Sequence, residues 1–135
     1  MANIRRKYRE HDFRTRVLSA YGGACACCGV QLRLVEAAHI IPVASPKSTD
    51  ETTNGIALCS LHHKAYDQNL LSFDASYRIE VSGSEIDKLK KLDLVGGLTL
   101  FTSGLKAAIA LPADKRDYPA APYIRESRKV RNWVG

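Results

Sequence analysis

The chain has 135 residues, of which 45% are hydrophobic, and this length predicts one domain over residues 1–135 and excludes two domains of ordinary size. It has no run of about 18 apolar residues and no apolar segment behind its charged N-terminus. We therefore expect no membrane span, no signal peptide and a cytoplasmic protein. Twenty Lys and Arg against 14 Asp and Glu give a net charge of +6, which favours partners that carry negative charge.

The first half of the chain predicts a helix, a hairpin and a second helix. Residues 10–21 place apolar side chains at helical spacing, and Gly22 and Gly23 follow as a stop signal. Residues 32–41 are rich in aliphatic and β-branched side chains and predict a strand pair or hairpin arm, which ends at Pro42. An exposed loop, a short strand and a helix then follow, at residues 45–53, 56–58 and 60–68.

The second half of the chain carries weaker patterns. Tyr77, Ile79 and Val81 alternate along the chain and indicate one strand of a further hairpin. The predicted elements are a hairpin, a short helix, two small strands and a final basic helix, at residues 70–81, 85–92, 99–101, 107–111 and 123–134.

Basic residues gather at the two ends of the chain. The N-terminal group is Arg5, Arg6, Lys7, Arg9, Arg14 and Arg16, and the C-terminal group is Arg125, Arg128, Lys129 and Arg131. Such groups fit a footprint for phosphates, but they are equally typical of a solvated helix face that keeps a protein soluble. Charge alone leaves both interpretations open.

Two close pairs of metal-binding side chains flank the predicted hairpin arm. Cys25 and Cys28 are separated by two residues, and Cys59 and His62 repeat this spacing. Structural Zn²⁺ sites take four Cys or His donors in a tetrahedron, usually from two such pairs, and Gly29 suits the tight turn of a zinc knuckle. In a reducing cytoplasm, paired cysteines are more often metal ligands than disulfides. The spacing therefore predicts a structural zinc site.

Other interpretations of the same residues stay open. The cysteines could be buried apolar side chains or form disulfides, with His62 at the surface. Cys27 could replace Cys25 as a ligand, although its spacing to Cys28 is less usual. We expect Cys27 to be a buried free thiol.

Three further motifs carry a resemblance to a known family. They read Ala37-Ala38-His39-Ile40-Ile41-Pro42, Asn54-Gly55-Ile56-x-Leu58 and His63-x-x-Tyr66-Asp67, after a lead-in Phe13-Arg14-x-x-Val17-Leu18-x-Ala20-Tyr21-Gly22. In this order they resemble the HNH endonuclease family, in particular its restriction-type branch. The resemblance implies an α+β fold with a ββα-metal (His-Me finger) core over residues 10–82. A zinc knuckle, an N-terminal helix and a small C-terminal α/β extension over residues 83–135 complete it.

The resemblance also assigns roles in a catalytic site. His39 would be the general base on a water molecule, a task that suits an imidazole at neutral pH. Asn54 would brace the loop and orient that base. His63 would bind a catalytic divalent ion, Mg²⁺ or Mn²⁺, over a phosphodiester bond.

Helical spacing assigns the neighbours of His63. Asp67 is four residues further on, so the two share one face of a helix and can hold a single ion, whereas His62 points about 100° away and can serve the zinc. Many family members have a ligand directly before the general base, where this chain has Ala38. Asp67 or Glu36 must then supply the missing donor. Asp67 is favoured because Glu36 would have to reach across the pleat of the strand, although Asp67 could instead make a helix-end hydrogen bond.

The resemblance, together with these residues, implies a metal-dependent DNA endonuclease that serves restriction or phage defence. The candidate nucleic-acid contacts are Arg5, Arg6, Lys7, Arg14 and Lys64. Specificity would come from a homodimer or from a partner specificity subunit. The alternative is a non-catalytic, zinc-stabilised nucleic-acid-binding module, and a third hypothesis is a structural zinc protein that binds another protein.

Overall fold

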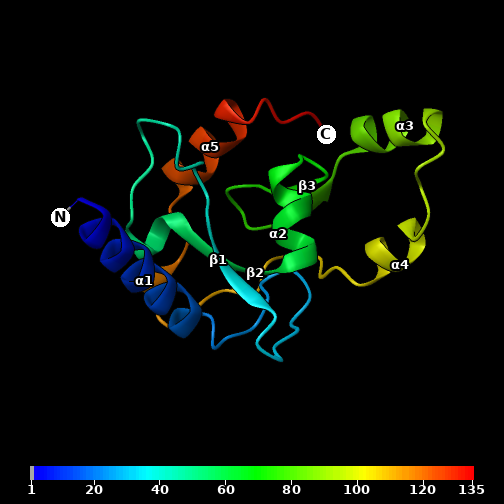
Figure 1. Ribbon diagram of the computed structural model, residues 1–135. Helices are drawn as coiled ribbons and strands as arrows, with labels where there is room; N and C mark the ends of the chain where they lie inside the picture. The colour runs from blue at the N-terminus through cyan, green and yellow to red at the C-terminus, as the bar shows by residue number, and fades with distance from the viewer. Residues whose placement is uncertain (1) are drawn as a thin grey trace.

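The computed structural model describes residues 2–135, and for residues 2–4 and 6 it describes the backbone alone. The side chain of Arg6, a predicted nucleic-acid contact, therefore lies outside the described residues. The helices are α1 (Ala2–Ala20), α2 (Ser60–Asp67), α3 (Gly83–Lys91), α4 (Leu98–Ser103) and α5 (Ala121–Val130), with short 3-10 helices at Thr52–Asn54 and Lys115–Asp117. The strands are β1 (Val35–His39), β2 (Gly55–Cys59), β3 (Leu71–Phe73) and β4 (Ile79–Val81) (Figure 1).

A hairpin of β1 and β2 with helix α2 forms the centre of the fold. The strands are antiparallel, with Val35 opposite Cys59 and His39 opposite Gly55. All five residues of β2 are buried, so both faces of this strand are covered. Helix α2 begins at the residue after β2. Strand, loop, strand and helix thus follow in the predicted order, and the α+β class is confirmed.

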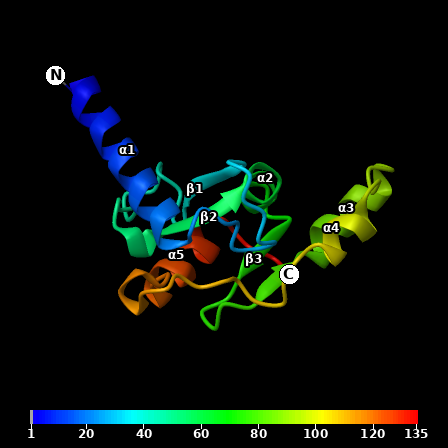
Figure 2. The same ribbon diagram turned by 90° about the horizontal axis from the view of Figure 1, so that it is seen from below.

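Helix α1 packs the C-terminal half of its length against the hairpin, and its N-terminal half projects from the body (Figure 2). Phe13 and Val17 are buried on one face of the helix, four residues apart. A Cβ atom on Gly55 would lie 3.0 Å from the Phe13 ring and would overlap the Val17 side chain. Glycine at position 55 therefore permits the close approach of α1 to the start of β2, where Gly55 pairs with His39 of β1.

Helix α5 covers the chain where it leaves β1. The Ser127 hydroxyl donates a hydrogen bond to the Ile40 carbonyl at 2.6 Å, and the Tyr66 hydroxyl of α2 donates to the same carbonyl at 3.0 Å. Both side chains are buried. Helices α2 and α5 are thereby tied to one backbone oxygen.

The β3–β4 hairpin leads to helices α3 and α4, which lie at the end of the molecule away from α1 in both views (Figures 1 and 2). The further hairpin and the helix near residues 85–92 were both predicted correctly. Within the part of the chain that the structure describes, no helix is both long and apolar enough to pass through a bilayer.

The small strand predicted at residues 99–101 is wrong, because this segment lies in helix α4. The Thr102 hydroxyl donates to the Leu98 carbonyl at 3.0 Å, so its hydrogen bond is made within the helix. Leu98 and Phe101 are one helical turn apart and line the same apolar pocket. Packing outweighs the β propensity of the threonines.

The strand predicted at residues 107–111 is also wrong. Only an isolated bridge between Arg78 and Ala108 forms there. The Ile109 amide donates to the Tyr77 carbonyl. The next amide, that of Ala110, instead donates to the carbonyl of Ala26, which lies between Cys25 and Cys27. Because these hydrogen bonds go to two different segments, the extended chain forms no continuous strand pairing with either of them.

Three predicted boundaries shift. Leu32 and Arg33 have φ values of 54° and 57°, a left-handed turn that delays the strand expected from residue 32 until Val35. The first helix begins at Ala2 instead of residue 10, although it ends where the glycine pair predicted. The last helix runs from Ala121 to Val130 instead of residues 123–134.

Replacing Gly55 tests the contact between α1 and the hairpin. We expect Gly55→Ala to lower the free energy of unfolding by about 1–3 kcal/mol, because Val17 and Phe13 must move to admit the methyl group. Urea unfolding measures the change. The control is Gly83→Ala in α3, where no atom lies within 4 Å of the new methyl group and the change should stay below about 1 kcal/mol. Equal effects of the two substitutions would contradict the proposed role of close packing.

Candidate functional site

Three cysteines and one histidine meet where α1 ends and α2 begins. Cys25 and Cys28 lie in a turn closed by the Gly29 amide, which donates to the Cys25 carbonyl at 2.8 Å, and Gly29 has a φ of 83°. Cys59 is the last residue of β2, and His62 lies in the first turn of α2. The hydrogen-bonded turn holds Cys25 close to Cys28, and the direct junction of β2 with α2 holds Cys59 close to His62.

The donor atoms of Cys25, Cys28, Cys59 and His62 all lie within 4.8 Å of one another. His62 Nδ1 is 3.5 Å from the Cys25 sulfur and 3.2 Å from the Cys59 sulfur. Tetrahedral Zn²⁺ places neighbouring sulfur and nitrogen donors about 3.5 Å apart, given its bond lengths. The four predicted residues therefore form a Cys3His cluster that could hold a metal ion.

Cys27 is buried and stands outside this set, as expected. Its contact with Cys25 holds the pKa of Cys25 well below the usual thiol range. The same contact, together with burial, raises the pKa of Cys27 far above that range. By the geometry of the donor atoms, Cys25 belongs to the group that could hold a metal ion and Cys27 does not. Among the described cysteines none forms a disulfide.

A second group of donors surrounds His63 on the neighbouring face of α2. His63 Nδ1 is 2.7 Å from a Glu36 carboxylate oxygen on β1, and His63 Nε2 is 3.5 Å from an Asp67 carboxylate oxygen. Glu36 therefore does reach His63, but it holds the ring nitrogen opposite to the one that faces Asp67. Nε2 and the Asp67 carboxylate are two donors that could share a cation, and the Glu36 contact resembles the carboxylate–histidine pairs that orient metal ligands.

His39 ends β1 and is held on two sides. Its ring stacks on Phe13 of α1 with 4.0 Å between ring centroids and 10° between ring planes. Its Nε2 atom is 3.0 Å from a carboxylate oxygen of Asp50, a residue of the loop between the strands. The side chain is 18% exposed, so the ring is shielded but accessible. Sequence analysis missed Asp50 as a partner of His39.

Asn54 is fully buried and organises the same loop. Its side-chain oxygen accepts a hydrogen bond from the Ile41 amide at 3.0 Å, and its Nδ2 donates to the Thr49 carbonyl at 2.8 Å. Its backbone carbonyl accepts from the Ile40 amide at 2.8 Å. One amide side chain thus ties both ends of the loop that carries Asp50.

Arg131 connects the two histidine groups. Its guanidinium donates to the His39 carbonyl at 3.3 Å and to the Asp67 carboxylate at 3.3 Å, and it lies 4.0 Å from the centroid of the Tyr66 ring. The end of β1 and the last turn of α2 are therefore close enough for one guanidinium to contact both. The Arg131 side chain is only 10% exposed. It therefore packs inside the fold, whereas its place in the sequence suggests an exposed basic residue.

The predicted nucleic-acid contacts divide by exposure. Arg5, Lys7, Arg14 and Lys64 are exposed, the first three on α1 and the last on α2. Arg16, by contrast, is bound to Asp12 and to the loop, with a hydrogen bond of 2.8 Å to the Asp50 carbonyl.

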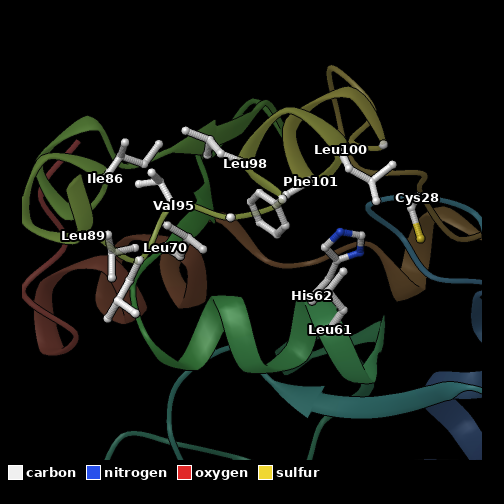
Figure 3. Close-up of a pocket in the computed structure, with 14 residues that line it drawn as sticks. Cys28, Leu61, His62, Leu70, Ile86, Leu89, Val95, Leu98, Leu100 and Phe101 are labelled. Carbon is white, nitrogen blue, oxygen red and sulfur yellow. The ribbon is translucent and has the colours of Figure 1, made fainter. Parts of the chain in front are cut away.

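An apolar pocket of about 410 Å³ lies between α2 and the α3–α4 segment, as Figure 3 shows. Leu70, Ile86, Leu89, Val95, Leu98 and Phe101 line it, and His62 faces it from α2. The His62 ring contacts Phe101 at 5.7 Å between centroids. The pocket therefore borders the cysteine cluster and lies apart from His39.

Comparisons with known proteins agree with this arrangement. Residues 25–74 match a family model described as HNH endonuclease. A solved structure named "Modification dependent TagI restriction endonuclease" superposes with a TM-score of 0.61 at 16% sequence identity. The superposition covers 88% of this chain and 37% of that chain, so this chain spans well under half of the solved one. No curated protein matches the sequence.

Alanine substitutions test the Cys3His assignment. Because metal binding in such sites is largely folding energy, we expect Cys59→Ala and Cys25→Ala to lose bound metal and to unfold at a lower temperature or not fold. Cys27→Ala is the matched control and should retain one metal ion per chain. Elemental analysis of the purified proteins measures the content. Retention in Cys25→Ala with loss in Cys27→Ala would reverse the assignment of the two thiols.

Proposed function

We propose that this chain, whose residues 25–74 match a family model described as HNH endonuclease, hydrolyses phosphodiester bonds in DNA with the help of a divalent ion. The observation that carries the proposal is that the Arg131 guanidinium contacts both the His39 backbone carbonyl and the Asp67 carboxylate, which brings the end of β1 close to the Glu36–His63–Asp67 group. A base for water and donors for a cation are what this reaction requires.

His39 is the proposed general base. Its imidazole accepts a proton from the water molecule whose oxygen bonds to phosphorus, the bond from phosphorus to the 3′ oxygen breaks, and that oxygen takes a proton from solvent. A neutral imidazole can do this at ordinary pH. The stacked Phe13 ring and the Asp50 contact support the role because they fix the imidazole plane before substrate binds.

His63 and Asp67 are the proposed ligands of the catalytic ion, which we expect to be Mg²⁺ or Mn²⁺. The nitrogen and oxygen donors are of the kind that such an ion takes, and Nε2 and the carboxylate oxygen stand 3.5 Å apart. An ion held there would supply charge stabilisation for the phosphate and the leaving oxygen. Glu36 orients His63, and Asn54 braces the loop beside His39.

The Cys3His cluster is the proposed structural zinc site. A donor set of three sulfurs and one imidazole favours Zn²⁺ over harder cations, and four protein donors leave no open position for a substrate. Its place at the start of α2 supports a role in holding that helix in the orientation that His63 needs.

Exposed cations on two helices are the proposed contacts with the phosphate backbone. Arg5, Lys7 and Arg14 are exposed on α1, and Lys64 is exposed on α2, one residue after His63. Such contacts position a duplex without reading its sequence. Specificity would then come from a homodimer or a partner specificity subunit, and a role in restriction or phage defence agrees with the restriction enzyme that shares the fold.

Plasmid cleavage tests the proposed activity. We expect the purified protein with Mg²⁺ or Mn²⁺ to convert supercoiled plasmid to nicked or linear DNA, and His39→Ala to lower the rate by about 100- to 10,000-fold through loss of the base. The control is His11→Ala, an exposed histidine of α1, which should leave the rate unchanged. DNA binding without cleavage under every divalent ion would instead support the non-catalytic binding module.

Metal dependence tests the roles of the two carboxylates. We expect Asp67→Asn to raise the Mn²⁺ concentration for half-maximal cleavage at least 10-fold more than Glu36→Gln does, because Asp67 is the proposed ligand and Glu36 acts through His63. Asp87→Asn, an exposed acid on α3, is the control for charge. A larger effect of Glu36→Gln would place Glu36 in the coordination of the ion.

A further inference from the structure

We propose that Asp50 is a positioning residue for His39. The Asp50 carboxylate accepts a hydrogen bond from the Nε2–H of the His39 imidazole, and this leaves Nδ1 as the atom that takes the proton from water. The inference rests on the proposed function of His39 as general base. The hydrogen bond itself can be tested independently of that function.

The contact is direct and joins two residues eleven positions apart. His39 Nε2 and the Asp50 carboxylate oxygen are 3.0 Å apart, an ordinary hydrogen-bond distance. Phe13 covers one face of the same ring. The imidazole is therefore held at its edge by Asp50 and on one face by Phe13. Rotation of the ring would break the hydrogen bond and expose the Phe13 face.

The backbone of Asp50 is fixed from both neighbouring sides. Arg16 of α1 donates to the Asp50 carbonyl at 2.8 Å and also bonds to the Thr52 hydroxyl. Asn54 donates to the Thr49 carbonyl at 2.8 Å. The carboxylate is 50% exposed, but the carbonyls of Thr49 and Asp50 both accept hydrogen bonds from side chains of other elements. A loop acid anchored in this way is suited to orient a side chain.

A carboxylate in this place selects the tautomer of the ring. When the neutral imidazole keeps its proton on Nε2 and donates it to Asp50, the lone pair of Nδ1 is free to accept a proton. Once Nδ1 has taken that proton, the ring is an imidazolium beside an anion, which stabilises it. The Asp50 carboxylate keeps its charge throughout, and no proton moves to it.

The charges near His39 are consistent with this role. Asp50 is the acid that faces the ring, from the loop. Arg131 contacts the His39 backbone carbonyl from the C-terminal side, and Arg16 contacts the backbone of Asp50. From α1 the ring meets the apolar Phe13. Within the described part of the chain, the ionised partner of the ring is therefore Asp50.

Kinetics of three variants test the inference. We expect Asp50→Ala to lower kcat for plasmid cleavage by about 10- to 100-fold with KM for DNA unchanged, because an unoriented base affects the chemical step and not binding. Asp50→Glu, which keeps a carboxylate on a longer arm, should recover part of the loss. The control is Glu51→Gln, the neighbouring acid, which contacts Tyr123 and not His39 and should keep the full kcat.

A spectroscopic measurement separates orientation from general damage to the fold. In long-range proton–nitrogen correlation spectra, His39 of the wild type should show its proton on Nε2, and Asp50→Ala should show a mixture of tautomers. Unfolding midpoints of both proteins should agree.

The outcomes distinguish the two proposals. A wild type that fails to cleave, or a fully active His39→Ala, would overturn the proposed function and with it the catalytic part of the Asp50 role. An inactive His39→Ala beside a fully active Asp50→Ala would overturn the Asp50 role alone. A wild-type His39 with its proton on Nδ1 would overturn the hydrogen bond, whatever the activity.

Discussion

Helix α2 has eight residues, too few for a helix to persist in water without support, where about 12 are needed. Its first turn carries His62 in the Cys3His cluster, and the next residue, His63, faces Glu36 and Asp67. Adjacent residues of a helix point about 100° apart, so fixing one ring fixes the direction of the other. The orientation of α2 is therefore the constraint on which the candidate catalytic site depends.

The end of β1 is held by a different kind of contact. There the packing of Phe13, the close approach at Gly55 and the buried Asn54 define where the backbone turns and how the imidazole lies. Arg131 then joins this end to α2 through its two contacts. One half of the site is therefore held by the Cys3His cluster and the other half by tertiary packing.

Much of the core could be predicted because the sequence signals are local. The order of strands and helices follows from apolar spacing, and the Cys3His cluster follows from the repeated two-residue gap. The resemblance to the HNH family is confirmed by the matching family model. The roles of His39, Asn54 and His63 follow from that resemblance and remain predictions.

The missed features depend on contacts between distant parts of the chain. In the sequence, Asp50 is one polar residue of a predicted exposed loop, and Arg131 is one of several basic residues near the C-terminus. Only the fold shows that both contact His39. The helix at residues 98–103 has the same origin, since its threonines favour a strand until an apolar pocket selects the other conformation. No local pattern distinguishes these residues from their neighbours.

Phe13 and Arg14 are consecutive on α1, yet one lies under the His39 ring and the other faces solvent. Inserting or deleting a single residue between Phe13 and the end of α1 would rotate the part of α1 before that point by about 100°, and the Phe13 ring would no longer stack on the His39 ring. Relatives of this protein should therefore vary the length of that arm freely at its outer end. The stretch from Phe13 to Gly22 should keep a constant number of residues through evolution.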